Sequence, residues 1–396
     1  MITIIILLIL ATISIQSLTN TGLFAKANEA KEKTENKQKE ESKILENYLA
    51  QMNSITFSNV DKTNTNPEGA MPKKAVVIEG DANKGIVIKD SNENEWTWIE
   101  VPMSVTAGKT SDNEIEEALK TYASDYREGK TGQNLNWTDE WYEGCGMSES
   151  DYNTTKGKML QSIKTNGGFW ISRYEIGDNT ATTNNTTRTS DSGITGVAVS
   201  KANQIPYNWV TCSQAQTLAK GMSADSSKIS SLPFGIQWDL TCKFLETKTE
   251  LTKDDIKTNS TNWGNYKNNS LTLSRGKYII NPWKSSSIWK NFNEDTENYV
   301  KNSQTTNDVN YKQLLTTGAS EETKKMNIYD LSGNVWKWTL EHATSNTSTP
   351  CSDRGGSLYS NGSDIPGAYR DNNGTTVRND DISFFLRFIN RINRVG

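Results

Sequence analysis

The chain has 396 residues, of which 34% are hydrophobic and 23% charged, and its formal net charge is −4. Twelve tryptophans allow a sizeable core, whereas the lack of a basic surplus or a basic, aromatic-interleaved stretch argues against a nucleic-acid partner. The four cysteines, Cys145, Cys212, Cys242 and Cys351, have no Cys-x-x-Cys spacing, which favours free thiols and leaves disulfides open.

The N-terminus predicts an apolar helix followed by a charged one. Residues 2–18 are almost wholly apolar, near the short limit for crossing a bilayer. Residues 25–52 are charged and helix-favouring, with apolar side chains between Ile44 and Met52 on one face. We therefore expect a membrane helix over 1–20, an amphipathic stalk helix over 21–53, and a membrane-anchored domain exported to the cell surface.

This arrangement resembles the N-terminal helix of type IV pilins and pseudopilins. The resemblance implies assembly into a pilus or pseudopilus. Because the basic leader of that family is missing here, a plain membrane anchor with a stalk is favoured over a filament subunit.

The next segments alternate between loops and short elements. Residues 54–95 are expected to be a linker with one hairpin, and Trp96–Pro102 alternates like a half-buried strand that ends at proline. A short helix is expected over Ile115–Lys120. Gly167–Gly177 is a glycine turn that leads into an alternating strand, and the Thr/Asn/Ser-rich residues 179–194 are expected to be an exposed or disordered loop.

Helix signals follow in the middle of the chain. Thr211 or Ser213 is expected to cap a helix that continues to Ala219. Leu232–Asp239 then leads into another helix.

Two glycine turns frame the C-terminal part. Gly333-Asn334 is a turn signal, and Trp336 and Trp338 behind it would share one face of a buried strand. Arg354-Gly355-Gly356-Ser357 is a second tight-backbone site.

These motifs, in this order, resemble the formylglycine-generating-enzyme (sulfatase-modifying factor) family. The matching segments are Trp96–Pro102, Gly167–Gly177, Pro206–Ala219, Leu232–Asp239, Trp263-Gly264-Asn265-Tyr266, Gly333–Trp338 and Arg354–Ser357. Of the family's final Ile-Gly-Phe-Arg only the arginine, Arg387, is kept, and the loss of the glycine puts the backbone of the last strand in doubt. The resemblance implies a loop-rich α+β domain of C-type-lectin-like fold over residues 96–396. Its scaffold would comprise Gly333, Asn334, Trp336, Trp338, Arg354, Gly355, Gly356, Ser357 and Arg387.

The chemistry of that family is not expected here. Ser360 and Ile365 stand where its two copper-binding cysteines would fall, and Cu(I) needs soft thiolates. The single histidine, His342, cannot hold iron alone. Lys337 replaces a glutamate near the family's structural calcium, which argues against calcium at this turn. We therefore expect no catalytic residue, metal or cofactor, with a formylglycine-type oxidase and a structural minor pilin as alternatives.

The C-terminal tail suggests a binding surface instead. All 33 lysines lie at or before Lys337, and from His342 onward the chain lacks Lys, Glu, Gln, Met and Trp. The side-chain types present can all arise from an Asn codon by changes at its adenines, a composition that resembles the variable proteins of diversity-generating retroelements. A lysine-poor loop region is the alternative.

This resemblance implies a variable region over 354–389 that binds a protein or glycan. Its aromatic side chains would offer rigid contacts and its polar ones adaptable hydrogen bonds. The expected contact residues are Leu358, Tyr359, Ser360, Asn361, Ser363, Asp364, Tyr369, Asp371, Asn372, Asn373, Asn379, Asp380, Asp381, Ser383, Phe384 and Phe385.

Overall fold

A computed structural model describes residues 23–57, 59–128, 136–222, 228–284, 286–293, 299–301 and 312–390. The chain divides into two compact units, Met1–Ile55 and Thr56–Gly396. The apolar segment 1–20 lies outside the described residues. Within the ranges given, no helix combines the length and the apolar character needed to cross a bilayer.

Helix α2 (Leu23–Phe57) makes up the described part of the first unit and ends just inside the second. It is rich in Glu, Lys, Ala and Gln, which are strong helix formers, and it contains no Gly or Pro. Exposed i,i+4 pairs such as Lys33–Glu29, at 2.7 Å, add modest support. The helix covers the stalk expected over 21–53.

The second unit contains an antiparallel six-stranded sheet in the order β1-β2-β3-β5-β19-β9. Its strands are β1 (Val76–Glu79), β2 (Val87–Lys89), β3 (Glu95–Glu100), β5 (Gly168–Ser172), β19 (Arg387–Asn390) and β9 (Lys228–Ser231). β1 and β2 form the hairpin expected within 54–95. Because β2 also pairs with β3, this segment belongs to the folded sheet and is more than a linker.

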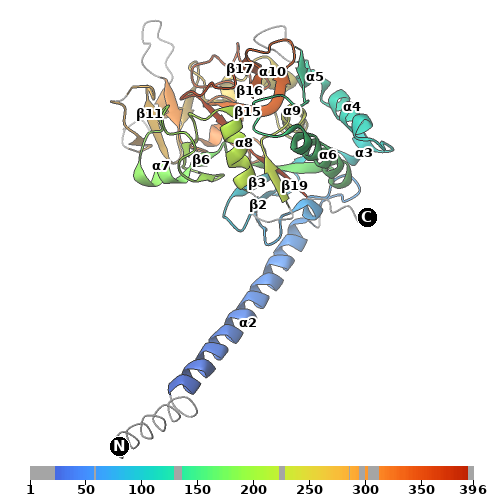
Figure 1. Ribbon diagram of the computed structural model, residues 1–396, viewed down its shortest axis with the longest axis vertical. Coiled ribbons are helices and arrows are strands. Elements are labelled where there is room, and N and C mark those ends of the chain that lie inside the picture. Colours follow the sequence, from blue (N-terminus) through green and yellow to red (C-terminus); the bar gives the residue numbers. More distant parts are fainter. Residues whose placement is uncertain are drawn as a thin grey trace, which may run out of the picture. The chain divides into compact units, whose positions relative to one another are not determined.

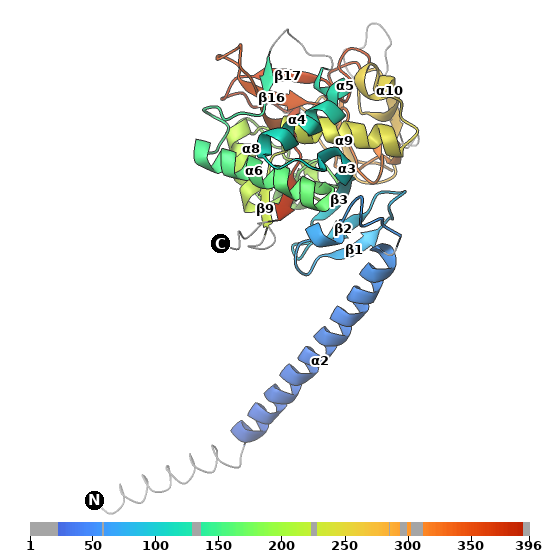
Figure 2. The same cartoon turned by 90° about the vertical axis from the view of Figure 1, so that its right-hand side faces the viewer.

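A five-stranded sheet carries most of the C-terminal region (Figures 1 and 2). Its order is β17 (Arg370–Asn373), β16 (Cys351–Arg354), β15 (Trp336–Ala343) and β18 (Ile382–Phe384), and β4 (Trp137–Thr138) also pairs with β15. The pairing is antiparallel except between β15 and β18. Both views place β16 and β17 at the opposite end of this unit from β2.

Helices α8 (Cys212–Gly221) and α9 (Gly235–Lys248) connect the two sheets. α8 contacts β9 and β15, and α9 contacts β3 and β15. Thr211 caps α8 in a capping box with Gln214, as the sequence predicted. The remaining helices are α3 (Met103–Thr106), α4 (Asp112–Tyr122), α5 (Ser124–Arg127), α6 (Glu149–Asn166), α7 (Asn179–Asn184) and α10 (Lys253–Lys257), with 3₁₀ turns at Glu68–Ala70, Thr261–Trp263 and Glu321–Thr323.

Three small antiparallel sheets complete the strands. They pair β6 (Gly177–Asp178) with β7 (Ala198–Val199) and β8 (Ile205–Pro206), β11 (Lys277–Ile280) with β12 (Lys290–Asn291) and β14 (Gln313–Leu315), and β10 (Ser270–Thr272) with β13 (Tyr299–Lys301).

The Thr/Asn/Ser-rich segment 179–194 is better ordered than its composition indicated. Asp178 caps α7 through the N–H groups of Thr180 and Ala181, and Arg188 is buried. The guanidinium group of Arg188 pairs with Asp178 and lies 3.8 Å from the Tyr207 ring centroid. Most residues of the segment are exposed, as one of the two expected alternatives has it, but it includes helix α7 and one buried arginine that ties it to the core.

The core joins segments from both ends of the second unit. The Trp96 and Phe388 rings pack edge to face at 4.7 Å, and Trp98 packs against Trp170 at 5.1 Å. Trp338 is fully buried, and its Nε1–H donates to the Val210 carbonyl at 2.9 Å. The second unit is thus a mixed α+β structure with several antiparallel sheets, as predicted.

Candidate functional site

Two glycine turns set the position of β15 and of the loop behind β16. Gly333 and Asn334 have φ of +73° and +61°, and Gly355 and Gly356 have φ of +88° and +73°. A Cβ on Gly333 would meet the Asn265 carbonyl oxygen at 2.5 Å, so this turn requires glycine. The two turns contact each other, since the Gly333 N–H donates to the Gly355 carbonyl at 2.9 Å. This confirms the turns expected from the sequence.

One face of the five-stranded sheet is held by a buried network of charges. Glu341 on β15 accepts hydrogen bonds from Arg127 at 2.9 Å, Arg354 at 3.1 Å and Arg370 at 2.8 Å. Burial alone would raise the pKa of Glu341, but the guanidinium groups of Arg370, Arg127 and Arg354 lower it to about 2.

The same arginines also reach helix α9. Asp239 accepts from Arg354 at 2.6 Å and from Arg370 at 3.3 Å, and Asp139 pairs with Arg127 at 3.2 Å. Three cations therefore face three carboxylates, and β15, β16 and β17 are fixed to α9 and α5. Arg354, which the sequence placed in the scaffold, is fully buried within this network.

Lys337 occupies the turn where the resembled family places calcium. Its ammonium group is fully buried and donates to the carbonyls of Leu331, at 3.4 Å, and Gly333. Burial lowers its pKa to about 8, while Glu175 and Asp330 oppose the shift. A lysine cation here contacts the backbone oxygens of the turn.

Five residues expected on the contact surface are buried. Leu358 packs in a small cluster with Ile279 and Val335, and Phe384 and Phe385 belong to the main core. Ser383 donates to the Ile176 carbonyl at 3.3 Å, and Ser360 is only 8% exposed. Phe384 and Phe385 were expected to make surface contacts. That expectation is wrong, because Phe384 packs against the Tyr207 ring and Phe385 against the Trp238 ring in the core.

Other candidate residues meet around an acidic and aromatic cluster. Asp353 and Asp371 are cross-strand partners on β16 and β17, so they share a face. Trp336 and Tyr369 lie with ring centroids 5.9 Å apart. We call Trp336, Asp353, Tyr369, Asp371, Asn373 and Asp381 the acidic–aromatic face.

Asp353 is the buried centre of this face, and the sequence reasoning missed it. It has no exposed surface; Asn373 donates to its Oδ2 at 2.7 Å, and its Oδ1 has no partner in the described part of the chain. Burial and the neighbouring charges of Asp371 and Asp381 raise the pKa of Asp353 well above its usual range. Only the strand register, which a single sequence does not reveal, brings Asp353 and Asp371 together.

Asp381 lies where this face continues toward the loop after Gly356. The Ser357 hydroxyl donates to Asp381 Oδ2 at 2.8 Å, and the backbone N–H of Trp336 donates to the backbone carbonyl of Asp381 at 2.6 Å. Burial, with the charge of Asp380, raises the pKa of Asp381 to about 7, and burial also raises that of Asp371.

A second aromatic group adjoins Asp381. The Tyr359 hydroxyl donates to Asp380, and Tyr359 stacks obliquely on Trp283 with centroids 5.6 Å apart. The Lys312 ammonium lies 4.7 Å from the Tyr359 ring centroid and 5.7 Å from that of Trp283. Trp283 is 45% exposed and lies outside the predicted variable region; its local sequence gave no signal of this role.

The remaining candidates are polar and more exposed. Asp364 and Asn379 are exposed, and Asn361, Ser363 and Asn372 are half-buried. Asn361 donates to Asp364 at 2.8 Å, and Asn372 donates to the Thr349 carbonyl at 3.0 Å. The structure therefore brings some predicted residues together around Asp353 and distributes the others along the adjacent loops.

The residues considered for catalysis lie in the interior. All four cysteines are buried and free, as the sequence favoured. The His342 Nδ1–H donates to the Glu140 carbonyl at 3.1 Å, and the imidazole ring packs on Tyr142. Within the described residues, no group of three or more His, Cys, Asp or Glu side chains is placed to hold a metal ion.

The Arg387 side chain lies in the protein core. Its guanidinium group is fully buried and lies 5.1 Å from the Phe234 ring centroid, and burial lowers its pKa to about 9. It therefore packs in the core beside helix α9.

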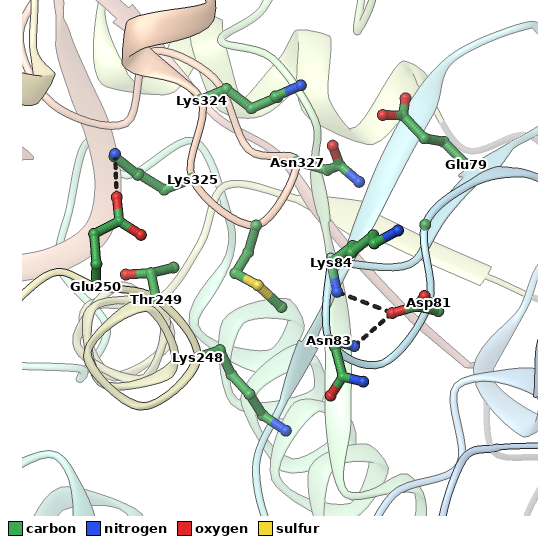
Figure 3. A pocket seen from close by; sticks show the side chains of 12 residues that line it. Glu79, Asp81, Asn83, Lys84, Lys248, Thr249, Glu250, Lys324, Lys325 and Asn327 are labelled. Carbon is green, nitrogen blue, oxygen red and sulfur yellow. Dashed lines mark hydrogen bonds and ion pairs between the residues drawn. The ribbon is translucent and has the colours of Figure 1, made fainter.

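An open hollow of about 690 Å³ lies elsewhere on the second unit (Figure 3). Its lining includes Lys84, Lys248, Lys324 and Lys325 together with acidic side chains. Lys325 pairs with Glu250 at 2.7 Å. Because positive and negative side chains both line the hollow, it does not favour ligands of one charge over the other. Its lining contains no residue of the predicted variable region.

Comparison with known proteins gives distant structural similarities. No family model matches the chain, and no curated protein matches it. Similar solved structures include Treponema denticola variable protein 1, at 15% identity, covering 56% of this chain and 84% of that one with a TM-score of 0.32. A structure titled CarF matches at 14% identity, covering 57% of this chain and 87% of that one with a TM-score of 0.32.

Proposed function

We propose that this protein is a non-catalytic ligand-binding protein whose C-terminal region binds a protein or glycan. The observation that carries the proposal is the presence of partly exposed aromatic, carboxylate and amide side chains on strand β17 and on the loops that adjoin the five-stranded sheet. Tyr359, Tyr369, Asp371 and Asn373 are half-buried, and Asn379 is exposed. Such a mixture suits adaptable recognition, because tyrosine adds rigid contact area and short polar side chains add hydrogen bonds.

The buried supports of this surface favour the same proposal. The Glu341 network and the two glycine turns fix the strands without using the surface side chains. Substitutions between 358 and 381 on the exposed side would therefore leave the scaffold intact. This separation fits a region diversified by a retroelement on a C-type-lectin-like scaffold of the formylglycine-generating-enzyme type.

For localisation we propose a membrane-anchored protein with its second unit on the cell surface, through the apolar segment 1–20. Separation of membranes, followed by protease treatment of intact cells, tests both parts. Loss of the protein from the membrane fraction after deletion of residues 2–18 is the expected result. Recovery of the full-length protein in the soluble fraction of unmodified cells would contradict it.

A binding experiment tests the functional proposal. The purified protein is screened against a displayed random-peptide library and a glycan array, beside a variant with Tyr359→Ala, Asn373→Ala and Asn379→Ala. The matched control carries Lys84→Ala and Lys248→Ala at the hollow of Figure 3. We expect ligands that bind wild type and control but are lost by the first variant. Ligands lost only by the control would contradict the proposal.

The absence of catalysis has its own test. The protein is loaded anaerobically with copper and offered a cysteine-containing sulfatase peptide. We expect no aldehyde product, and turnover would support the oxidase alternative. Sequencing of the flanking DNA tests diversification, for which a reverse transcriptase and a near-copy of the 3′ coding end differing at adenines are expected.

A further inference from the structure

The ligand class of the acidic–aromatic face follows from its charges. Asp353 and Asp371 are cross-strand partners, and the charges of Asp371 and Asp381 both act on the buried carboxyl group of Asp353. The partners that the described residues give them are neutral: the Asn373 amide for Asp353, the Asn372 N–H for Asp371 and the Ser357 hydroxyl for Asp381. The positive charge of Lys312 weakly opposes the rise that burial causes in the pKa of Asp381, and the Lys312 ammonium group lies against the Tyr359 ring. Among the described residues, no lysine or arginine is hydrogen-bonded to any of the three carboxyl groups, so a bound cation would stabilise their ionised forms.

Asp353 provides a second and independent sign of a missing partner. A buried carboxylate oxygen normally accepts a hydrogen bond, because leaving it unpaired costs free energy. Asp353 is fully buried, yet its Oδ1 has no partner among the described residues. Its neighbours Asp371 and Asp381 are only partly buried, so a ligand can approach the cluster from their side.

We propose that Asp353, Asp371 and Asp381 recognise an organic cation, the guanidinium group of an arginine side chain on a protein ligand. This inference rests on the proposed binding function and specifies its ligand. A guanidinium group offers five N–H donors and stacks on aromatic rings, so it can contact the carboxylates while packing beside Trp336 or Tyr369.

Two features favour an organic cation over a hard metal ion. Ring faces attract guanidinium and ammonium groups, whereas calcium and magnesium take oxygen ligands. The chain itself also contains a comparable arrangement next to the cluster. There Lys312 lies over the rings of Tyr359 and Trp283. Burial raises the pKa of Asp380, and the positive charge of Lys312 opposes that rise.

The test uses the full-length protein labelled with 5-fluorotryptophan, with the Trp336 resonance assigned through Trp336→Phe. N-acetyl-arginine amide is the probe, and its neutral isostere N-acetyl-citrulline amide is the control ligand. We expect the arginine probe to shift the Trp336 resonance saturably at pH 7.5 and citrulline to leave it unchanged. Asp371→Asn and Asp381→Asn should each weaken binding at least about tenfold, since each removes a charge that faces the cation.

The matched control is Asp151→Asn on α6, which packs on the other large sheet. It should bind like wild type, and circular dichroism should show that all variants are folded. Equal shifts with arginine and citrulline, no shift with arginine, or displacement of arginine by CaCl₂ would each overturn the inference.

The two proposals fail in different ways. Library-selected ligands that need Tyr359 and Asn379 but bind Asp371→Asn as well as wild type would overturn the cation inference alone. Ligands that ignore all of these substitutions would overturn the proposed function itself.

Discussion

Glu341→Gln tests whether the buried charge network fixes the sheet beneath the proposed binding surface. The substitution keeps the shape of the side chain and removes one negative charge. Glu341 is fully buried and accepts hydrogen bonds from three arginines at 2.8–3.1 Å. Three guanidinium groups would then face only Asp139 and Asp239, leaving one positive charge uncompensated in the interior.

The expected loss of unfolding free energy is about 3–5 kcal/mol, the usual cost of breaking a buried ion pair from one side. The same chemical change at Glu250 is the control. Glu250 forms one 2.7 Å pair with Lys325, but its side chain is 75% exposed. Surface pairs contribute little, so Glu250→Gln should cost less than about 1 kcal/mol.

Urea unfolding at pH 7, followed by near-ultraviolet circular dichroism, measures both variants. The pH dependence gives a second reading. Because the folded pKa of Glu341 is lowered to about 2, its stabilisation is present above the unfolded value near 4.5 and is lost as the pH falls toward 2. This loss should be absent in Glu341→Gln. Equal costs for the two glutamine variants would refute the reasoning.

Further predictions concern the cluster, a turn and the exposed tryptophan. The raised pKa of Asp381 predicts stabilisation that is present near pH 4 and lost as the pH rises through about 7, and Asp381→Asn should reduce this slope in urea unfolding. An unchanged slope would contradict it. Gly333→Ala should lower the free energy of unfolding by at least about 1–3 kcal/mol, because φ at this position is left-handed and the added Cβ would clash with Asn265. Gly108→Ala should lower it by less, since Gly108 has the same φ but open space around it. Equal costs would count against the turn's role. Trp283→Ala should leave the unfolding free energy within about 1 kcal/mol but weaken binding of selected ligands, measured by calorimetry. Unchanged affinity would exclude Trp283 from the surface.

The local elements of the C-terminal region could be predicted from the sequence. Gly333-Asn334 predicts a turn, because few residues other than Gly and Asn readily adopt the left-handed conformation. The alternation of Trp336 and Trp338 indicates a buried strand. Capping of α8 by Thr211 is equally local, since the hydroxyl reaches an N–H only three residues on.

The exposure of individual candidates could not be predicted. Ser383-Phe384-Phe385 has no alternation that marks a surface, and its two phenylalanines are buried by contacts with Tyr207 and Trp238, which are distant in the sequence. Asp353 was missed for the same reason, because its cross-strand partner Asp371 is fixed by register. Trp283 lies far from the variable region in sequence and joins it only through Tyr359.

The central claim, that the ligand binds on the C-terminal surface, is tested most directly by hydrogen exchange of the full-length protein with and without a library-selected ligand. The account predicts slowed exchange in residues 357–381, which include β17, and unchanged exchange around the hollow of Figure 3, at residues 79–84 and 324–327. Slowed exchange at the hollow with no change over 357–381 would contradict it.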